Sequence, residues 1–462
     1  MANIARVVSP IDGAVYAEHA LMATAEALDA VRQAAVAQKA WQQKPLAQRI
    51  AILAEATERL ELEADAVVEE LAHSMGRPVA LGGGEIRGFR ERSDYMLGVA
   101  PTALADTVPS PQPGFERFIR REPVGTVLAI APWNYPYMSA VNIVWPALAA
   151  GNAVFLKHAQ QTVMAGARIE RILKAAGLPE NVFRAVPMSH ETTAAVVQAE
   201  PVRMICFTGS VRGGRAIQQA VGGASGFPGT GLELGGKDPA YVRPDADLDM
   251  AAAGIADGIL SNAGQSCCSI ERVYVDEAVY DDFMVRLEKE ARAFCLGNPL
   301  EAETTLGPLV SVKAADFVRE QVAEALAAGA HNLIDPALYP AEGGAYLAPR
   351  ILVDADHSMR LMTEESFGPV AGVMKVRSDD EAVALMNDSE YGLTASIWTD
   401  DVDVARTLGD RIETGTVFMN RCDYLDPALA WTGVKSTGRG HSMSAAGYDS
   451  LTRPKSYHLK IA

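Results

Sequence analysis

The chain has little positive charge and few cysteines. Its 41 Lys and Arg residues are outnumbered by 58 Asp and Glu residues, which leaves a formal net charge of −17 at pH 7. A field of this sign repels phosphate backbones, so we expect no nucleic-acid partner. The five cysteines are an odd, sparse set in a chain of 462 residues. They predict reduced thiols and a cytoplasmic protein.

Long apolar runs, repeats and metal-ligand clusters are also lacking. The first residues, 1-MANIARVVSPIDG-13, contain no apolar signal core. The most apolar long run, 141-VNIVWPALAAGNAVFL-156, is interrupted by Asn142, Pro146 and Gly151. It therefore predicts a helix, a turn and a buried strand, and we expect no membrane partner. The eight histidines have no ligand spacing, so no metal site is predicted.

What remains is the composition of a multidomain globular protein. Hydrophobic residues make up 49% of the chain and charged residues 21%. This balance is typical of folded domains, and 462 residues exceed one ordinary core. The length therefore predicts two or three domains.

From about residue 124, short apolar runs alternate with segments of helical spacing. Apolar strands that alternate with helices are typical of a parallel sheet covered on both faces. Such doubly wound sheets bind ligands beyond the carboxyl ends of their strands. The predicted strands are 126–131, 153–157, 182–186 and 203–207, and the predicted helices are 137–150, 162–176, 190–199 and a segment from about 211.

A second α/β block follows over 235–425. Its predicted strands and helices are 272–276, 278–293, 312–329 and 370–376. Helical spacing over 22–75, interrupted at Pro45, predicts two or three surface helices that stop near 76–78. Polar alternation predicts exposed edge strands at 114–125 and 455–462.

Three turns at predicted strand ends carry groups suited to chemistry. After strand 203–207, Gly209 and Ser210 precede a helix whose first turn holds Gly214, and free N–H groups there favour a phosphate. Asn134 offers an amide donor suited to an oxyanion. Glu233, before two glycines, is suited to general-base work. Taken singly, each also fits an ordinary role as turn, helix cap or loop residue.

The stretch 261-SNAGQSCCSI-270 places Cys267 and Cys268 side by side after a Gly-Gln pair. Together with 134-NYP-136, 207-FTGS-210, 232-LELGGK-237 and 364-EESFGPV-370, it resembles the motifs of the NAD(P)-dependent aldehyde dehydrogenase superfamily. The motifs follow the family's order and intervals through nearly the whole chain. The resemblance implies that Cys267, the cysteine of Gly-Gln-x-Cys, is the nucleophile. Cys268 is then a packing neighbour, since a vicinal disulfide would be strained.

The resemblance also implies a hydrolytic, non-acylating mechanism. The Cys267 thiolate adds to an aldehyde, Asn134 and the Cys267 N–H stabilise the oxyanion, and hydride passes to the cofactor. Glu233 then activates the water that cleaves the thioester. Relatives that pass the acyl group to coenzyme A lack a carboxylate at this position, so the product is expected to be a carboxylic acid.

By the same resemblance, the cofactor is NAD or NADP. NAD-preferring members often carry Glu three residues after the motif lysine, where this chain has Gln160. A neutral amide does not repel a 2′-phosphate, so NADP is expected to be tolerated. The residues implied to bind the cofactor are Trp133, Lys157, Gln160, Gly209, Ser210, Gly214, Glu365 and Phe367.

The implied aldehyde tunnel contains Asn142, Cys268, Arg421 and Tyr424. Asn142 and Arg421 favour a polar aldehyde, including an acidic semialdehyde. The alternative for Arg421 is a salt bridge outside the tunnel with Asp423 or Asp426.

The expected architecture is two doubly wound parallel α/β domains with a small antiparallel oligomerisation sheet. Residues 1–108 and 129–234 would form the dinucleotide-binding domain and 235–430 the catalytic domain. Residues 109–128 and 431–462 would form the oligomerisation element, whose open edges predict a homodimer or homotetramer.

Two other functions stay open on sequence grounds. One is a thiol esterase or hydrolase that uses Cys267 without a cofactor. It would need a base near the thiol, and no histidine offers an identifiable partner motif. The other is a catalytically silent NAD(P)-binding protein, which the presence of Cys267, Asn134 and Glu233 together argues against.

Overall fold

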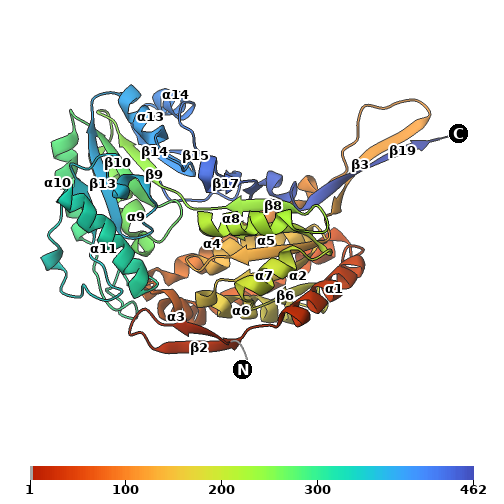
Figure 1. Ribbon diagram of the computed structural model, residues 1–462. Helices are drawn as coiled ribbons and strands as arrows, with labels where there is room; N and C mark the ends of the chain where they lie inside the picture. The colour runs from red at the N-terminus through yellow and green to blue at the C-terminus, as the bar shows by residue number, and fades with distance from the viewer. Residues whose placement is uncertain (1–3, 462) are drawn as a thin grey trace.

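Two parallel sheets form the centres of two lobes in the structure, a computed structural model that describes residues 4–461 (Figure 1). The first sheet is built from buried apolar strands in the middle of the chain. Its order is β17 (Gly438–Arg439), β8 (Gly229–Glu233), β7 (Val202–Thr208), β4 (Thr126–Ala131), β5 (Ala153–His158) and β6 (Phe183–Ala185). All neighbours pair in parallel except β17, which runs antiparallel to β8.

Helices cover both faces of this sheet, because alternate residues of each strand point to opposite sides. On β4, Val127 and Ala129 belong to one apolar core and Leu128 and Ile130 to another. The first core is completed by α2 (Leu46–Glu61), α3 (Ala64–Met75), α4 (Val79–Ala103), α5 (Pro136–Ala149) and α6 (Val163–Ala175). The second is completed by α1 (Thr24–Trp41), α7 (His190–Val197) and α8 (Val211–Gly222).

The second lobe repeats the arrangement with seven strands. The order is β11 (His331–Asn332), β12 (Arg350–Val353), β13 (Val370–Val376), β10 (Ile270–Asp276), β9 (Asp238–Val242), β14 (Thr394–Trp398) and β15 (Thr416–Met419), with only the β11–β12 pair antiparallel. The helices are α9 (Leu248–Leu260), α10 (Tyr280–Arg292), α11 (Val312–Ala327), α12 (Arg360–Thr363), α13 (Asp379–Asn387) and α14 (Val402–Gly409).

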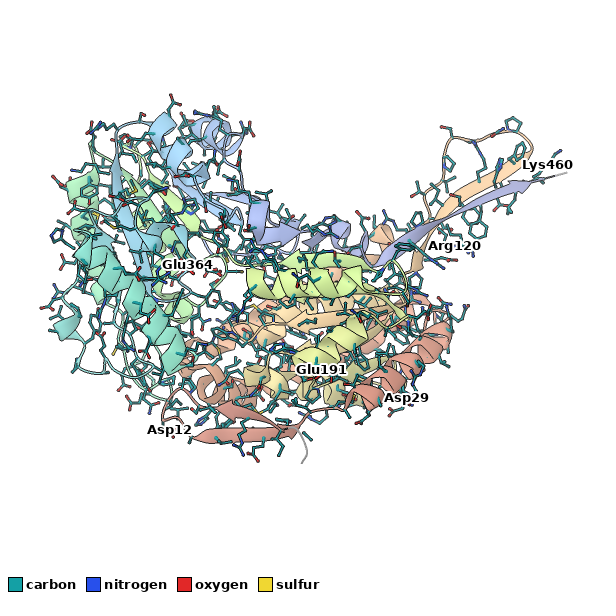
Figure 2. The ribbon with its side chains drawn as sticks, viewed as in Figure 1. Asp12, Asp29, Arg120, Glu191, Glu364 and Lys460 are labelled. Atoms are coloured by element: carbon teal, nitrogen blue, oxygen red, sulfur yellow. The ribbon has the colours of Figure 1, made fainter. Side chains whose placement is uncertain are left out.

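A two-stranded ribbon projects away from the lobes, with the C-terminus at its tip (Figure 1). It pairs β3 (Phe115–Pro123) with β19 (Thr452–Lys460) in unbroken antiparallel register. Phe118 stacks on Tyr457 with ring centroids 4.4 Å apart. Figure 2 shows Arg120 and Lys460 on this ribbon, clear of the lobes.

The expected fold class is confirmed: two parallel α/β lobes and a small antiparallel ribbon. The predicted helices over 22–75 are α1 to α3, but they are more than a surface layer, since Leu53, Leu60 and Leu71 are fully buried. Helix α4 and an N-terminal hairpin of β1 (Ile4–Val8) and β2 (Val15–Ala20) were not predicted. In the second lobe, α9, α13, α14 and the strands β9, β12, β14 and β15 were not predicted either. No helix among residues 4–461 is long and apolar enough to cross a membrane.

The C-terminal segment divides between the first lobe and the ribbon. Strand β17 extends the sheet of the first lobe, and β16 (Trp431–Thr432) pairs with β18 (His441–Ser442) close by. Only β19 belongs to the ribbon. At the other expected boundary, residue 128 falls inside β4. The segment from residue 431 therefore reaches the neighbourhood of Glu233 before it enters the ribbon.

Candidate active site

A cavity of about 1730 Å³ lies at the carboxyl ends of β4, β5, β7 and β8, and is closed on the other side by loops of the second lobe. This is the place where parallel sheets bind ligands. Figure 2 labels Glu364, one of its lining residues, between the two lobes. The predicted site residues that line the cavity are Trp133, Asn134, Asn142, Lys157, Gln160, Gly209, Ser210, Glu233, Cys267, Cys268, Glu365, Phe367 and Tyr424. Gly214 and Arg421 do not line it.

The two adjacent cysteines have different surroundings. Cys267 is half-buried, whereas Cys268 is 1% exposed and donates a hydrogen bond to Asp423 Oδ1 at 2.8 Å. The neighbouring Cys267 side chain, burial and Asp423 together hold the pKa of Cys268 well above its ordinary value. Since the thiolate is the reactive form, Cys268 is held as an inert thiol. Cys267 is the accessible sulfur of the pair.

The glycines of 232-LELGGK-237 let the two lobes approach at this point. A Cβ on Gly235 would collide with the Glu365 carboxylate, and one on Gly236 would collide with the carbonyl oxygen of Cys267. Gly236 N donates to Glu365 Oε1 at 3.0 Å. The motif therefore brings the cysteine loop and the Glu365 loop against the end of β8, where Glu233 lies.

Asn134 follows β4 and is held next to the cysteine loop. Its Nδ2 donates to the carbonyl oxygen of Gln265 at 3.1 Å, two residues before Cys267. Gln265 is fixed in turn, because its Oε1 accepts from Val310 N at 2.7 Å. One hydrogen of the Asn134 amide is thus used for positioning, and the amide has a second one to offer to the cavity.

A buried ion pair outside the predicted motifs supports Asn134 from behind. Arg77 pairs with Glu85, and both side chains are almost fully buried. Arg77 also donates to the Asn134 carbonyl oxygen, while Glu85 Oε1 accepts from the backbone N–H groups of Tyr137 and Met138 at the start of α5. Glu85 therefore fixes the turn and the helix start together. Sequence reasoning missed this pair because α4 was not predicted.

Glu233 lies at the end of β8 with both carboxylate oxygens bonded. Thr208 Oγ1 donates to Oε2 at 3.1 Å, and Ser442 Oγ donates to Oε1 at 2.5 Å. Burial raises the pKa of Glu233, and these two hydrogen bonds oppose the rise. Ser442 comes from β18, more than two hundred positions along the chain, so no local pattern could have revealed it.

The cofactor side of the cavity starts at the ends of β5 and β7. Lys157 Nζ donates to the carbonyl oxygen of His158 at 3.2 Å, and burial lowers the pKa of the Lys157 ammonium. Ser210 caps α8 by accepting from Gly213 N at 3.2 Å. Exposed Gln160 donates to the Arg6 carbonyl oxygen at 3.0 Å. Because Ser210 and Gly213 both line the cavity, α8 presents its N-terminus to it, which suits a pyrophosphate.

Gly214 has a packing position instead of the expected ligand position. It lies in the first turn of α8, and a Cβ there would collide with the Leu234 side chain. The glycine therefore allows α8 to sit close to the chain after β8. Arg212, two residues after Ser210 and not predicted, does line the cavity and is exposed.

The opposite wall of the cofactor side is the loop that carries Glu365 and Phe367. Burial and the nearby Glu271 raise the pKa of Glu365 to about 8. Glu271 accepts from the backbone N–H groups of Ser366 and Phe367 at 2.8 and 2.9 Å and pairs with the buried Lys237. The rings of Phe367 and Trp133 pack edge-to-face, with their centroids 5.5 Å apart. The loop is thereby held in place by an ion pair beneath it.

The other end of the cavity, which we call the aldehyde end, is walled by α4, α5 and the loop 421–425. Glu91 and Arg92 of α4 and Asp423 line it, and none of the three was predicted. Tyr424 donates from its hydroxyl to Glu91 Oε1 at 2.6 Å. The motifs gave no signal for these residues, because they meet only when α4 packs beside α5.

Arg421 is not brought to the aldehyde end. Its side chain is exposed, and its guanidinium carbon lies 3.5 Å from the centroid of the Tyr424 ring. The alternative salt bridge is not formed either, since no ion pair joins Arg421 to Asp423 or Asp426. Asp423 instead accepts from Ser266 and Cys268, and Asp426 accepts from Ala428 N. The stacking on Tyr424 turns the cation outward.

Comparisons with known proteins agree with this site. The model of the aldehyde dehydrogenase family matches residues 2–457. The chain is 33% identical over 449 residues to succinate-semialdehyde dehydrogenase [NADP(+)] of Deinococcus radiodurans, covering 97% of this chain and 93% of the relative. It is 32% identical to 3-sulfolactaldehyde dehydrogenase of Pseudomonas putida, covering 96% and 91%.

A solved structure has the same fold over its whole length. Succinic semialdehyde dehydrogenase from Streptococcus pyogenes, in complex with NADP+, superposes with a TM-score of 0.93 at 28% identity, covering 98% of this chain and 99% of that one. With the family model matched from end to end and the relatives spanned almost completely, the chain belongs to the aldehyde dehydrogenase family.

Proposed function

We propose that the protein oxidises an aldehyde to a carboxylic acid through a thioester on Cys267, with NAD or NADP as the oxidant. The observation that carries this proposal is the convergence of four groups on one cavity: the accessible sulfur of Cys267, the Asn134 amide, the Glu233 carboxylate and the Glu365 loop. Asn134 and Glu233 lie at the ends of β4 and β8, and Cys267 lies in the loop between α9 and β10, so only the fold unites them.

The first step is nucleophilic. The Cys267 thiolate attacks the aldehyde carbon, and the charge that develops on oxygen is met by the Asn134 amide and the Cys267 N–H. An amide donor of this kind typically lowers the activation free energy by about 3–4 kcal/mol. The Arg77–Glu85 pair supports the donor indirectly, because it fixes the turn that carries Asn134.

The residues of the cofactor side fit a dinucleotide. The N-terminus of α8, capped by Ser210, suits the pyrophosphate, and Lys157 and Glu365 stand where ribose hydroxyls would be bound. Phe367 and Trp133 offer apolar surface for the nicotinamide ring. A nicotinamide held there would supply the oxidant, a site for the hydride that leaves the substrate carbon.

The last step is hydrolysis. We assign the general base to Glu233, because it lines the cavity together with Cys267 and burial raises its pKa above the ordinary value of a carboxylate. The hydroxyls of Thr208 and Ser442 donate to the Glu233 carboxylate and so favour its ionised form, which can accept a proton. A carboxylate at this position supports water as the acceptor of the acyl group, which makes the enzyme non-acylating.

The substrate class we propose is a polar aldehyde, including an acidic semialdehyde. Asn142, Tyr424, Arg92 and Asp423 give the aldehyde end a polar wall. The Deinococcus and Pseudomonas relatives carry names of enzymes for acidic aldehydes, which supports the same class.

The ribbon is the surface on which we expect subunits to pair into a homodimer or homotetramer. Among residues 4–461, β19 pairs with β3 alone and the ribbon stands clear of the lobes, so the outer edge of β19 is open to another chain. The outer edge of β3 is bridged at Ile119 by Thr107. The mass in solution, measured by light scattering, should be a multiple of 49.2 kDa, and a mass of one chain would contradict the expectation.

The decisive test uses the two cysteines against each other. We expect Cys267→Ala to abolish NAD(P)H formation from every aldehyde, by at least about a thousandfold, because the nucleophile is lost. Cys268→Ala should keep activity within about threefold, since Cys268 is a protonated packing thiol. Absorbance at 340 nm over a panel of aldehydes, with each cofactor, measures both variants.

The outcomes separate the proposal from its alternatives. Loss of activity in Cys268→Ala alone would reassign the nucleophile. Ester hydrolysis without cofactor, with no aldehyde oxidation, would favour a thiol esterase. Tight cofactor binding with no product from any aldehyde would favour a silent binding protein.

A further inference from the structure

One cation at the aldehyde end is buried without an anion. Arg92 is 8% exposed and lines the cavity, yet within residues 4–461 it forms no ion pair. Its Nη1 donates to the Met138 carbonyl oxygen at 3.1 Å and, more weakly, to Asn142 Oδ1 at 3.5 Å. A buried charge held only by neutral acceptors is costly, so a buried arginine ordinarily has a carboxylate beside it.

The carboxylates that approach Arg92 are all engaged elsewhere. Glu85 is paired with Arg77, Glu233 accepts from Thr208 and Ser442, and Asp423 accepts from Ser266 and Cys268. Glu91, next in the chain, is exposed and accepts from the Tyr424 hydroxyl. None is left to neutralise the guanidinium at hydrogen-bond distance.

The unused nitrogens of Arg92 are open to the cavity. Arg92 Nε and Nη2 form no hydrogen bond within residues 4–461. Neither nitrogen belongs to the buried polar atoms that lack a partner, so both keep some contact with the cavity space. The neighbouring amide is arranged to help, since Asn142 uses Oδ1 toward Arg92 and leaves its Nδ2 without a protein acceptor among residues 4–461. Asn142 is 4% exposed and also lines the cavity.

We propose that Arg92 and Asn142 form an anion subsite for the charged end of the substrate, so that the enzyme selects aldehydes carrying a carboxylate or sulfonate. The inference rests on the proposed aldehyde oxidation and names its selecting residues. A guanidinium fork and an amide N–H match the paired oxygens of such a group. Arg92 is fixed against α5 through Met138, so the subsite is rigid before the substrate arrives.

Asp423 opposes this selection and sets its strength. Its carboxylate lines the same end of the cavity, and burial raises its pKa to about 6. Near neutral pH it is therefore largely ionised and repels an anionic substrate. Asp423→Asn should increase kcat/KM for anionic aldehydes by a few fold, while Arg92→Gln should decrease it.

The first measurement compares aldehydes of equal length. For Arg92→Gln we expect the ratio of kcat/KM between succinate semialdehyde and butanal to fall by about tenfold to a hundredfold, with Arg92→Lys intermediate. Arg421→Gln is the matched control, because it removes a guanidinium outside the cavity, and its ratio should stay at the wild-type value. A sulfonated aldehyde of similar length shows whether sulfonate is accepted as well as carboxylate.

The second measurement needs neither cofactor nor oxidation. Succinate and propanesulfonate should slow the alkylation of Cys267 by iodoacetamide in the wild type, and Arg92→Gln should lose this protection. If Arg92→Gln keeps both the wild-type ratio and the protection, the anion subsite is refuted while aldehyde oxidation stands. If no aldehyde is oxidised but protection depends on Arg92, the subsite stands and the proposed reaction fails. If Arg92→Gln does not fold, Arg92→Lys and Asp423→Asn decide the matter through the same ratio and protection.

Discussion

The two ends of the cavity present different kinds of groups to a ligand. At the cofactor end, Lys157 is bonded to the His158 carbonyl and Glu365 to the N–H of Gly236. At the aldehyde end, Arg92 has no ion pair and Asp423 has a pKa of about 6. Lys157 and Arg92 are both buried cations without an ion pair among residues 4–461, but the rest of the two ends differs. The cofactor end presents the N-terminus of α8 and a loop fixed through its backbone N–H groups, whereas the aldehyde end presents the side chains of Arg92, Asn142 and Asp423. Cofactor binding should therefore depend on shape and position, and substrate choice on charge.

Between the two ends lies the proposed reaction centre. Substitutions there should have the largest effects on turnover, and these effects should be the same for acidic and neutral aldehydes. Glu233→Gln should reduce steady-state turnover by about a hundredfold or more, because the thioester loses its general base. The first turnover should survive as a burst of NAD(P)H. Rapid-mixing measurements with an acidic and a neutral aldehyde should show the same loss for both, and a loss confined to one would move Glu233 into substrate recognition.

Ser442 gives a pH test of the same group. Burial raises the pKa of Glu233 and the Ser442 hydroxyl opposes that rise, so Ser442→Ala should raise the pKa further. Glu233 acts as a base only when ionised. Thioester hydrolysis should therefore lose rate on the acid side, with its midpoint moved up by about one pH unit, the size expected from a lost bond to a charged group. An unmoved pH profile would show that Ser442 has no influence on the base.

The smallest expected effect is at the cofactor end. Gln160→Glu should reduce kcat/KM with NADP by about tenfold and leave NAD within about twofold, because an exposed carboxylate repels a 2′-phosphate only modestly. Combined with Arg92→Gln, the two losses should add, since one acts on the cofactor and the other on the aldehyde. Strong non-additivity would show that the two ends are coupled and would break the comparison.

The sequence predicted the cofactor end better than the aldehyde end, for a physical reason. Lys157 lies at the end of one evident apolar strand and Ser210 just after another, so a local pattern places each side chain at a sheet edge. The resemblance to a known family then assigned their roles. Gly214 was the exception, because a glycine in a helix turn serves packing as readily as ligand approach.

The aldehyde end depends on contacts between distant segments. Helix α4 contains Gly82, Gly83 and Gly84 near its start and Pro101 near its end, which hid it from helical patterns. Arg92 and Asp423 line one cavity because α4 packs on α5 and the loop 421–425 reaches the same end. Arg421 was the arginine predicted for the tunnel, but its side chain is exposed and stacks on Tyr424. Arg92, which was not predicted, is buried and lines the cavity.

The route of the C-terminal segment has a practical consequence for anyone handling the protein. Between Trp431 and Lys460 the chain lines the cavity through Trp431, extends the first sheet, donates a hydrogen bond from Ser442 to Glu233 and then becomes one strand of the ribbon. We therefore expect a truncation or affinity tag near this terminus to affect both the proposed subunit pairing and the proposed general base, Glu233. A drop in activity after such engineering would report damage at the base as readily as loss of a neighbouring subunit.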